Sequence, residues 1–204
     1  MTEKVKIQFE SGELEGIFKG LGNNRGVIIT HPHPDYGGDM HNGVVMTIEK
    51  AYHDNGYSTL RFNFRGTGNS TGDYDTFHDL CDDVAAAYRF MIDRGISDIT
   101  LAGYSFGAWI NAHADEKVER LTHQLLVSPP VSFMDFSQVR GFSCNSFVIC
   151  GDRDEYAALP AIKRHLESWN VTSFEIIKGC DHFYSGMVEQ LYIAVEKILF
   201  CKRP

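Results

Sequence analysis

A serine between two glycines is the first candidate for chemistry in this chain. Ser105 is the middle residue of the motif GYSFG, at 103–107, which follows an apolar run at 99–102 and opens a helix-like stretch at 106–114. A sharp strand-to-helix turn exposes such a serine oxygen, and the glycines keep neighbouring segments from clashing. The Phe106 N–H, at the start of the helix, would then donate to an oxyanion. The alternative is an ordinary serine cap of a helix.

A serine hydroxyl becomes a nucleophile when a base takes its proton and an acid orients that base. His182, in the loop GCDHF after the last predicted strand, is the preferred base, because His123 precedes a strand and His165 lies in a helical stretch. The acid is expected in the loop GDRDE, which follows the preceding strand. Asp154 is preferred to Asp152, because it lies far enough beyond the strand end to reach back to an imidazole.

The loop after the first buried strand is a candidate for binding the oxyanion. It reads HPHPDYGG, at 31–38, and its prolines have no N–H, so the donor must come from His31, His33 or a later residue. We expect the backbone N–H groups of His33 and Phe106 to form the oxyanion hole. The prolines would stiffen the loop, which suits a site that must not reorganise when charge develops.

The same loop also offers a metal-binding alternative. The spacing of His31, His33 and Asp35 resembles the HxHxDH signature of the metallo-β-lactamase family, and histidine and carboxylate side chains are common zinc ligands. Tyr36, however, stands where that signature has a histidine for the second metal, and both spacers are proline. We therefore expect no metal and no organic cofactor, with a metal-dependent hydrolase as an alternative function.

A glycine-rich loop, RGTGNS at 65–70, follows another predicted strand. It lacks both the GxGxxG pattern and the lysine of phosphate-binding loops. We interpret it as a structural turn in which Arg65 ties loops together near the site.

The chain that must position these residues has 204 residues, of which 43% are hydrophobic and 23% charged. This length predicts one domain, 1–204, with one well-buried core. A net charge of −8 argues against a nucleic-acid-binding protein, and the apolar runs are far shorter than the ~20 residues of a membrane-spanning helix. The first residues, MTEKVK, are unlike an export signal, so we expect a cytoplasmic protein with reduced cysteines. The sequence indicates no particular oligomeric state.

Strand and helix patterns alternate along most of the chain. Alternating apolar residues predict a hairpin at the N-terminus, with a turn at Ser11 and Gly12. Continuous apolar runs, typical of strands buried on both faces, occur at 27–30, 58–64, 99–102, 124–127, 147–150 and 174–177. Apolar stripes of helical spacing occur at 44–52, 77–92, 159–166 and 187–199. The alternation predicts an α/β fold in which a parallel sheet is covered on both faces and binds its ligand at the carboxyl ends of the strands.

The motifs together resemble the α/β-hydrolase superfamily, and in particular its small, lid-less bacterial members with an HPHP-x-x-GG loop. Six blocks in the family's order carry the resemblance: HPHPDYGG at 31–38, RFNFRGTGNSTG at 61–72, LAGYSFGA at 101–108, VSPPVSFMDFS at 127–137, GDRDE at 151–155 and GCDHFYSG at 179–186. It implies a mostly parallel, doubly wound sheet with antiparallel strands at the N-terminal end. It also implies Ser105, Asp154 and His182 as nucleophile, acid and base. The oxyanion hole would again be the amides of His33 and Phe106.

The sequence departs from the superfamily's D-x-R-G-x-G-x-S pattern at Asn63, which stands where many relatives have aspartate. This change concerns the structure of the turn more than the chemistry. The stretch at 128–143 is also too short for the helical lid of larger relatives, so we expect a minimal lid or none and a shallow, open site.

The residues expected to frame the site favour a small or medium acyl group over a long-chain lipid. They are Tyr36, Tyr104, Pro129, Pro130, Phe133 and Phe136. The main hypothesis is a serine hydrolase that cleaves carboxylic esters or thioesters of a small-molecule acyl substrate through an acyl-enzyme, with amide or peptide bonds as a more demanding alternative. A catalytically silent binding protein of the same fold is a further alternative, although no position of the catalytic set has been replaced.

Overall fold

A computed structural model of the chain describes residues 2–201, apart from the side chain of residue 201. Its strands are β1 (Thr2–Phe9), β2 (Gly12–Lys19), β3 (Arg25–Thr30), β4 (Ser58–Phe62), β5 (Asp98–Tyr104), β6 (His123–Val127), β7 (Asn145–Gly151) and β8 (Val171–Ile177). Its α-helices are α1 (Gly43–Asp54), α2 (Phe77–Ile92), α3 (Phe106–Ala114), α4 (Leu159–His165) and α5 (Val188–Cys201). Two short 3-10 helices are η1 (Pro34–Tyr36) and η2 (Asp115–Lys117).

The strands form one eight-stranded sheet in the order β1-β2-β4-β3-β5-β6-β7-β8. The pairs β1–β2 and β2–β4 are antiparallel, whereas every pair from β4–β3 to β7–β8 is parallel. The predicted α/β fold, with a mostly parallel sheet and antiparallel N-terminal strands, is confirmed. The carboxyl ends of β3 to β8 therefore lie at one edge of the sheet, where each of the candidate motifs begins.

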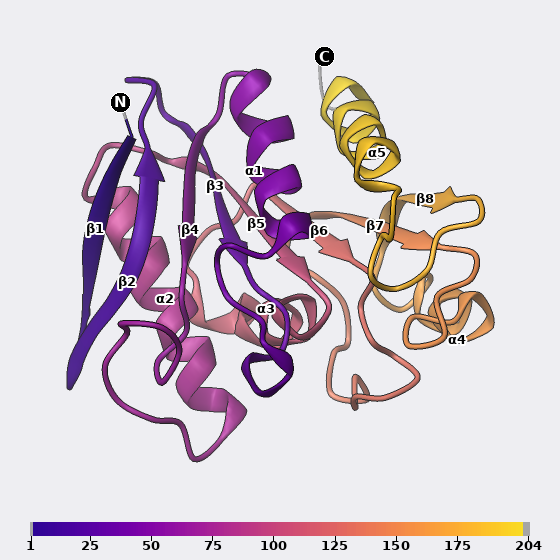
Figure 1. Cartoon of the computed structure of the whole chain (residues 1–204), viewed down its shortest axis with the longest axis horizontal. Helices are drawn as coiled ribbons and strands as arrows, with labels where there is room; N and C mark the ends of the chain where they lie inside the picture. The colour runs from indigo at the N-terminus through magenta and orange to yellow at the C-terminus, as the bar shows by residue number, and fades with distance from the viewer. Residues whose placement is uncertain (1, 202–204) are drawn as a thin grey trace.

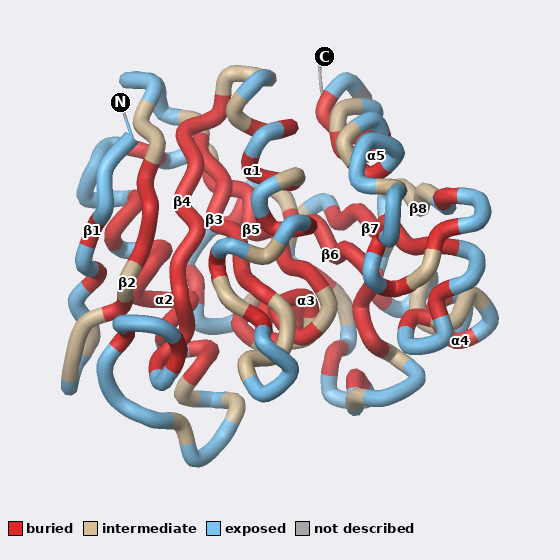
Figure 2. Tube along the Cα trace, in the orientation of Figure 1, coloured by how far each residue is buried: buried red, intermediate tan, exposed pale blue. Residues whose placement is uncertain are grey.

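Helices cover both faces of the sheet, as Figure 1 shows, with α1 and α5 side by side in front and α2 behind. One buried cluster joins α1 and α5 to the sheet through residues such as Ile48 and Leu191. A second cluster joins α2 and α3 to the opposite face through residues such as Leu80 and Ile110. A third lies around Trp169 and packs α4 against α3 and the last strands. Figure 2 shows the result, a sheet whose central strands are buried while the connecting loops are exposed.

The helix at 77–92 illustrates how closely the apolar spacing predicts an element. α2 has the predicted bounds, and it begins at a capping box in which Asp79 Oδ2 accepts the Thr76 N–H at 2.9 Å. Its buried stripe includes Leu80, Val84 and Met91, which pack against the sheet. Local capping and tertiary packing therefore favour the same helix.

The strand predicted at 58–64 ends earlier, because β4 stops at Phe62. The two following residues turn their N–H groups to other partners: Asn63 donates to the Glu15 carbonyl oxygen at 2.8 Å, and Phe64 donates to His31 Nε2 at 3.1 Å. Contacts with distant loops, which no local pattern reveals, therefore end the strand.

The connection between β6 and β7 contains no helix, so no lid covers the carboxyl edge of the sheet. Part of this connection packs into the interior instead, where Phe136 and Phe142 contact Trp169 with ring centroids 5.2 and 5.8 Å away. None of the helices within residues 2–201 is both long enough and apolar enough to cross a membrane.

Candidate active site

Ser105 occupies the sharp turn between β5 and α3. Its backbone has φ 53° and ψ −117°, a conformation that residues with a side chain rarely adopt. A Cβ atom on Gly103 would lie 2.6 Å from the Ala108 nitrogen, and one on Gly107 would lie 2.6 Å from Thr30 Oγ1. The two glycines are therefore required for α3 to pack closely against the ends of β5 and β3.

Three side chains from three strand ends form a chain of hydrogen bonds. Ser105 Oγ lies 2.8 Å from His182 Nε2, and His182 Nδ1 lies 2.9 Å from both carboxylate oxygens of Asp154. The Asp154 side chain is fully buried and the imidazole is nearly so. With Nδ1–H donated to the carboxylate, Nε2 is free to accept the serine proton, which is the arrangement that activates a serine.

Two loop amides orient the carboxylate of Asp154. The backbone N–H groups of Tyr156 and Ala157 donate to its Oδ1 at 3.0 and 2.8 Å. Asp152, the other candidate acid, instead accepts the Gly179 N–H at 2.6 Å. Asp154 therefore contacts the imidazole, whereas Asp152 ties the loop after β7 to the loop after β8.

The two other histidines considered as the base have ring partners of their own, and Asp181, which precedes His182 in the chain, bonds within its own loop. His165 stacks on Trp169, with ring centroids 4.7 Å apart, and the His123 ring lies 5.9 Å from that of Phe147. Asp181 accepts a hydrogen bond from the Ser185 N–H, which lowers the pKa of its carboxyl.

Two tyrosine hydroxyls fix the loop that carries His182. Tyr104 OH donates to the His182 carbonyl oxygen at 2.8 Å, and Tyr184 OH lies 2.9 Å from Ser128 Oγ. Burial raises the pKa of both phenols well above its ordinary value, so both hydroxyls stay protonated. Tyr184 and Ser128 also have positive φ, 55° and 46°. The sequence indicated a substrate contact for Tyr104, but no motif indicated these links between loops.

His31 anchors the loop that follows β3. Its buried ring accepts the Phe64 N–H at Nε2, at 3.1 Å, and its Nδ1 lies 2.7 Å from the Pro32 carbonyl oxygen. Burial lowers the pKa of His31 to about 4, so the ring is neutral and Nδ1–H is the donor. At the far end of the loop, Asn63 Oδ1 accepts the Met40 N–H at 2.8 Å. Asn63 thus has a structural role, as expected for its place in the turn.

The two residues expected to bind the oxyanion lie side by side. The ring centroids of His33 and Phe106 are 4.3 Å apart. As the first residue of α3, Phe106 has a backbone N–H without an acceptor inside the helix. Gly38 closes the loop on itself, because its N–H donates to the His33 carbonyl oxygen at 3.0 Å and a Cβ there would lie 2.1 Å from the Pro32 carbonyl oxygen.

The two histidines of the metal-binding alternative make other contacts through their rings. Both ring nitrogens of His31 are engaged by the backbone, and His33 Nδ1 accepts the Asp35 N–H at 3.3 Å. Over residues 2–201, no three histidine, cysteine, aspartate or glutamate side chains are grouped so that they could hold a metal ion.

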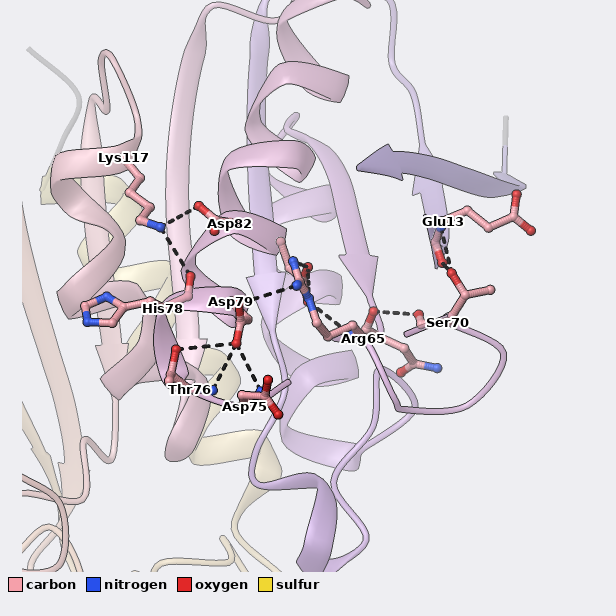
Figure 3. Close-up of polar contacts among 12 residues, drawn as sticks. Glu13, Arg65, Ser70, Asp75, Thr76, His78, Asp79, Asp82 and Lys117 are labelled. Carbon is pink, nitrogen blue, oxygen red and sulfur yellow. Dashed lines mark hydrogen bonds and ion pairs between the residues drawn. The ribbon is translucent and has the colours of Figure 1, made fainter. Parts of the chain in front are cut away.

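Arg65 forms the structural tie expected of the loop RGTGNS. Its Nε and its backbone N–H donate to the two carboxylate oxygens of Asp83, in α2, at 2.8 and 2.9 Å. Its guanidinium also lies 3.8 Å from Asp79, which accepts the N–H groups of Thr76 and Asp75 (Figure 3). The network holds the start of α2 against the end of β4.

Comparison with known proteins identifies the family to which this site belongs. The profile of the family described as serine aminopeptidase, S33, matches residues 26–144. The chain belongs to this family. An uncharacterized protein of Rickettsia prowazekii (strain Madrid E) is 32% identical over 201 residues, which cover 92% of this chain and 84% of that protein.

Solved structures place this S33-family chain among the α/β serine hydrolases. An alpha-beta serine hydrolase homologue from Coxiella burnetii is 33% identical, with a TM-score of 0.88 over 97% of both chains. An a/b serine hydrolase without lid from Xanthomonas campestris is 27% identical, with a TM-score of 0.85 over 96% of this chain and 92% of that one. The predicted superfamily and its small, lid-less subgroup are thereby confirmed, and the chain is a hydrolase.

A pocket of about 460 Å³ opens at Ser105 of this S33-family hydrolase. Tyr36, Tyr104 and Phe133 line it, as expected, together with Pro130. His33, Phe106 and His182 line it as well.

Two of the residues expected to frame the site do not line the pocket, and two others line it. Pro129 is buried and does not line the pocket, and Phe136 packs against Trp169 in the core. Tyr156 and Phe183 line the pocket instead, because each sits in a loop directly beside one of the hydrogen-bonded residues. Their signal in the sequence was an aromatic residue two positions after Asp154 and one directly after the histidine.

Proposed function

We propose that the protein is a serine hydrolase that cleaves carboxylic esters or thioesters of small to medium acyl groups through an acyl-enzyme. Ser105 is the nucleophile, His182 the base, and Asp154 the acid that orients the imidazole. The observation that carries the proposal is the unbroken chain of hydrogen bonds, 2.8 Å from Ser105 Oγ to Nε2 and 2.9 Å from Nδ1 to the carboxylate. Ser105 and His182 line the pocket described above, whose size suits a small molecule.

In the first half of the reaction, Ser105 Oγ attacks the ester carbonyl carbon while His182 Nε2 takes its proton. The backbone N–H groups of Phe106 and His33 hold the negative charge that develops on the carbonyl oxygen. The bond to the leaving oxygen or sulfur then breaks, and the imidazolium returns its proton to that atom, which leaves as an alcohol or thiol. Asp154 stabilises the imidazolium between these two transfers.

In the second half, water takes the place of the alcohol. His182 Nε2 removes a proton from the water as it attacks the acyl carbonyl carbon, and the same two amides hold the new oxyanion. The bond to Ser105 Oγ breaks, the imidazolium gives its proton back to the serine, and the carboxylic acid departs. The protein returns to its starting state without any other group.

Labelling with a fluorophosphonate tests this proposal, because the reagent phosphonylates a serine only where a base activates it. We expect the folded natural chain to be labelled and to hydrolyse p-nitrophenyl acetate, and Ser105→Ala to lose both properties. Ser132→Ala is a matched control, because Ser132 is an exposed serine in the loop after β6 that does not line the pocket.

Absence of labelling and of turnover in the folded natural chain would favour the catalytically silent binding protein. Labelling that persists in Ser105→Ala at its original rate would assign the nucleophile to a different residue. Either result overturns the proposal.

A further inference from the structure

The rings around Ser105 come from opposite sides of the nucleophile. Tyr36 belongs to the connection after β3, which neighbours β5 on one side, whereas Phe133, Tyr156 and Phe183 belong to the connections after β6, β7 and β8 on the other side. Phe133 and Phe183 are 72% and 65% exposed, although they are large apolar side chains. Exposed apolar groups that border a pocket are typical of a binding surface.

The three rings on the second side form a continuous surface that reaches the imidazole. The ring centroid of Tyr156 lies 5.7 Å from that of Phe133 and 6.2 Å from that of Phe183. The His182 ring lies 4.7 Å from Tyr156 and 5.5 Å from Phe183. These are distances at which aromatic rings attract one another. We call this surface, formed by Phe133, Tyr156 and Phe183, the aromatic ledge.

The position of the ledge determines which half of a substrate it contacts, provided that the proposed mechanism holds. His182 Nε2 must deliver a proton to the leaving oxygen, so the alcohol half of the ester lies against this imidazole when the bond breaks. The acyl carbonyl oxygen points instead to the amides of His33 and Phe106. The rings that pack on the imidazole are therefore the ones that the alcohol half meets.

We infer that the aromatic ledge is a subsite for the alcohol half of the ester and that it takes a flat, uncharged aromatic alcohol. A flat ring can lie on or against the edges of the Tyr156 and Phe183 rings, in the arrangements that favour aromatic pairs. Among the described residues, no lysine, arginine, aspartate or glutamate lines the pocket. A phosphate-bearing leaving group, such as that of an acyl-coenzyme A thioester, would thus meet no cation there.

A matched pair of acetate esters tests this inference. Benzyl acetate and cyclohexylmethyl acetate have the same acyl group and alcohols of similar size, but only the first presents an aromatic ring. We expect the natural chain to show a kcat/KM about three- to tenfold higher for the benzyl ester, which corresponds to the usual strength of an aromatic pair. Because both esters give the same acetyl-enzyme, the rate of its hydrolysis should be equal for the two.

Tyr156→Leu should lower the kcat/KM ratio of the two esters at least about twofold, because it removes the ring that contacts both Phe133 and Phe183 and keeps an apolar side chain. It also keeps the backbone N–H that donates to Asp154. Tyr36→Leu is the matched control, because Tyr36 lines the same pocket from the other side, and it should leave the ratio unchanged. A second pair, methyl 3-phenylpropanoate and methyl 3-cyclohexylpropanoate, places the difference on the acyl side, where Tyr156→Leu should not alter the ratio.

Several results would overturn the subsite while leaving the proposed hydrolase intact. They are equal kcat/KM values for the two acetates in the natural chain, a benzyl preference that Tyr156→Leu leaves undiminished, and a loss that falls equally on both acetates or on the acyl pair. Failure to hydrolyse any ester, together with failure of fluorophosphonate labelling, would instead overturn the proposed function on which the subsite rests.

Discussion

The two sets of loops that flank Ser105 are held in place by different means. On one side, the loop after β3 closes on its own backbone, because Gly38 packs on the Pro32 peptide and donates its N–H to the His33 carbonyl oxygen, while the buried ring of His31 ties the loop to the N–H of Phe64. On the other side, side chains join one loop to the next, since Asp152 bonds to the loop after β8 and Tyr104 to the His182 carbonyl.

This difference matches what each side is proposed to contribute. The loop after β3 is proposed to present a backbone N–H, and a backbone group is best positioned when the peptide itself cannot shift. The loops after β7 and β8 are proposed to present an aspartate and a histidine. These two side chains can bond only if the two loops are held in fixed positions relative to each other. We therefore expect substitutions on the two sides to impair the protein for different physical reasons. Four experiments test this difference.

The largest effect is expected from Asp154→Asn, on the side held by side chains. An amide can no longer accept the His182 Nδ1–H as a carboxylate does, so the imidazole loses the tautomer that leaves Nε2 free, and kcat should fall about 10⁴-fold. Asp152→Asn is the matched control in the same loop and should cost far less, because its contact is with the Gly179 N–H. Comparable losses for the two variants would mean that the loop, and not the acid, sets the rate.

A large effect is also expected on the backbone-held side, from Gly38→Ala. The added Cβ would lie 2.1 Å from the Pro32 carbonyl oxygen, so the peptide that leads into His33 must move. We expect kcat to fall about 10²–10³-fold, as for loss of one oxyanion donor, with a cooperative unfolding transition retained. Gly43→Ala is the control, since nothing lies within 4 Å of its Cβ position. An unimpaired Gly38→Ala enzyme would remove this loop from the oxyanion hole.

The pH dependence of stability should report on the same side. The pKa of His31 is lowered from 6.5 to about 4 by burial, so between these values the unfolded chain binds a proton that the folded chain does not. The free energy of unfolding is therefore unaffected by this histidine above pH 6.5. It falls as the pH falls below 6.5, by about 2 kcal/mol at pH 5. Urea unfolding at several pH values measures it, and His31→Asn should show a shallower slope. NMR titration of the natural chain gives an independent check, since a His31 ring that becomes protonated near pH 6.5 would contradict the prediction.

The smallest effect is expected from Tyr104→Phe, which removes one hydroxyl from the link between β5 and the His182 loop. The loss of this bond to a buried carbonyl should lower kcat about tenfold and leave KM nearly unchanged, because the imidazole is less well positioned. Tyr88→Phe removes the same kind of bond, from a tyrosine hydroxyl to the Arg120 carbonyl oxygen, far from the pocket. It should lower stability without changing kcat, and an equal effect of both variants on kcat would show that Tyr104 has no special role.

The sequence indicated the residues that meet at Ser105 because each one follows a buried apolar run. Parallel strands place their carboxyl ends at one edge, so Asp154 and His182 could be expected beside the serine without knowledge of any contact. The choice between Asp154 and Asp152 also followed from chain length beyond the strand. The bounds of a helix such as α2 could be predicted where the capping residues and the apolar stripe indicate the same start and end.

Features that depend on contacts between residues far apart in the chain could not be predicted from the sequence. The spacing of His31 fits a metal ligand as well as a structural ring, and only its contact with Phe64, 33 residues later, separates the two. Pro129 and Pro130 are adjacent, yet one is buried without lining the pocket and the other lines it. The positive φ of Ser128, which directs the chain into this turn, has no signature in the sequence.

The positive φ of Ser105 also affects the stability of the fold. A φ of 53° is readily adopted only by glycine, so the conformation of Ser105 costs free energy of folding. A residue at position 105 that could leave this conformation would make the fold more stable, but it would no longer present its side chain in the same way. The residue proposed as the nucleophile is thus one at which the fold gives up stability.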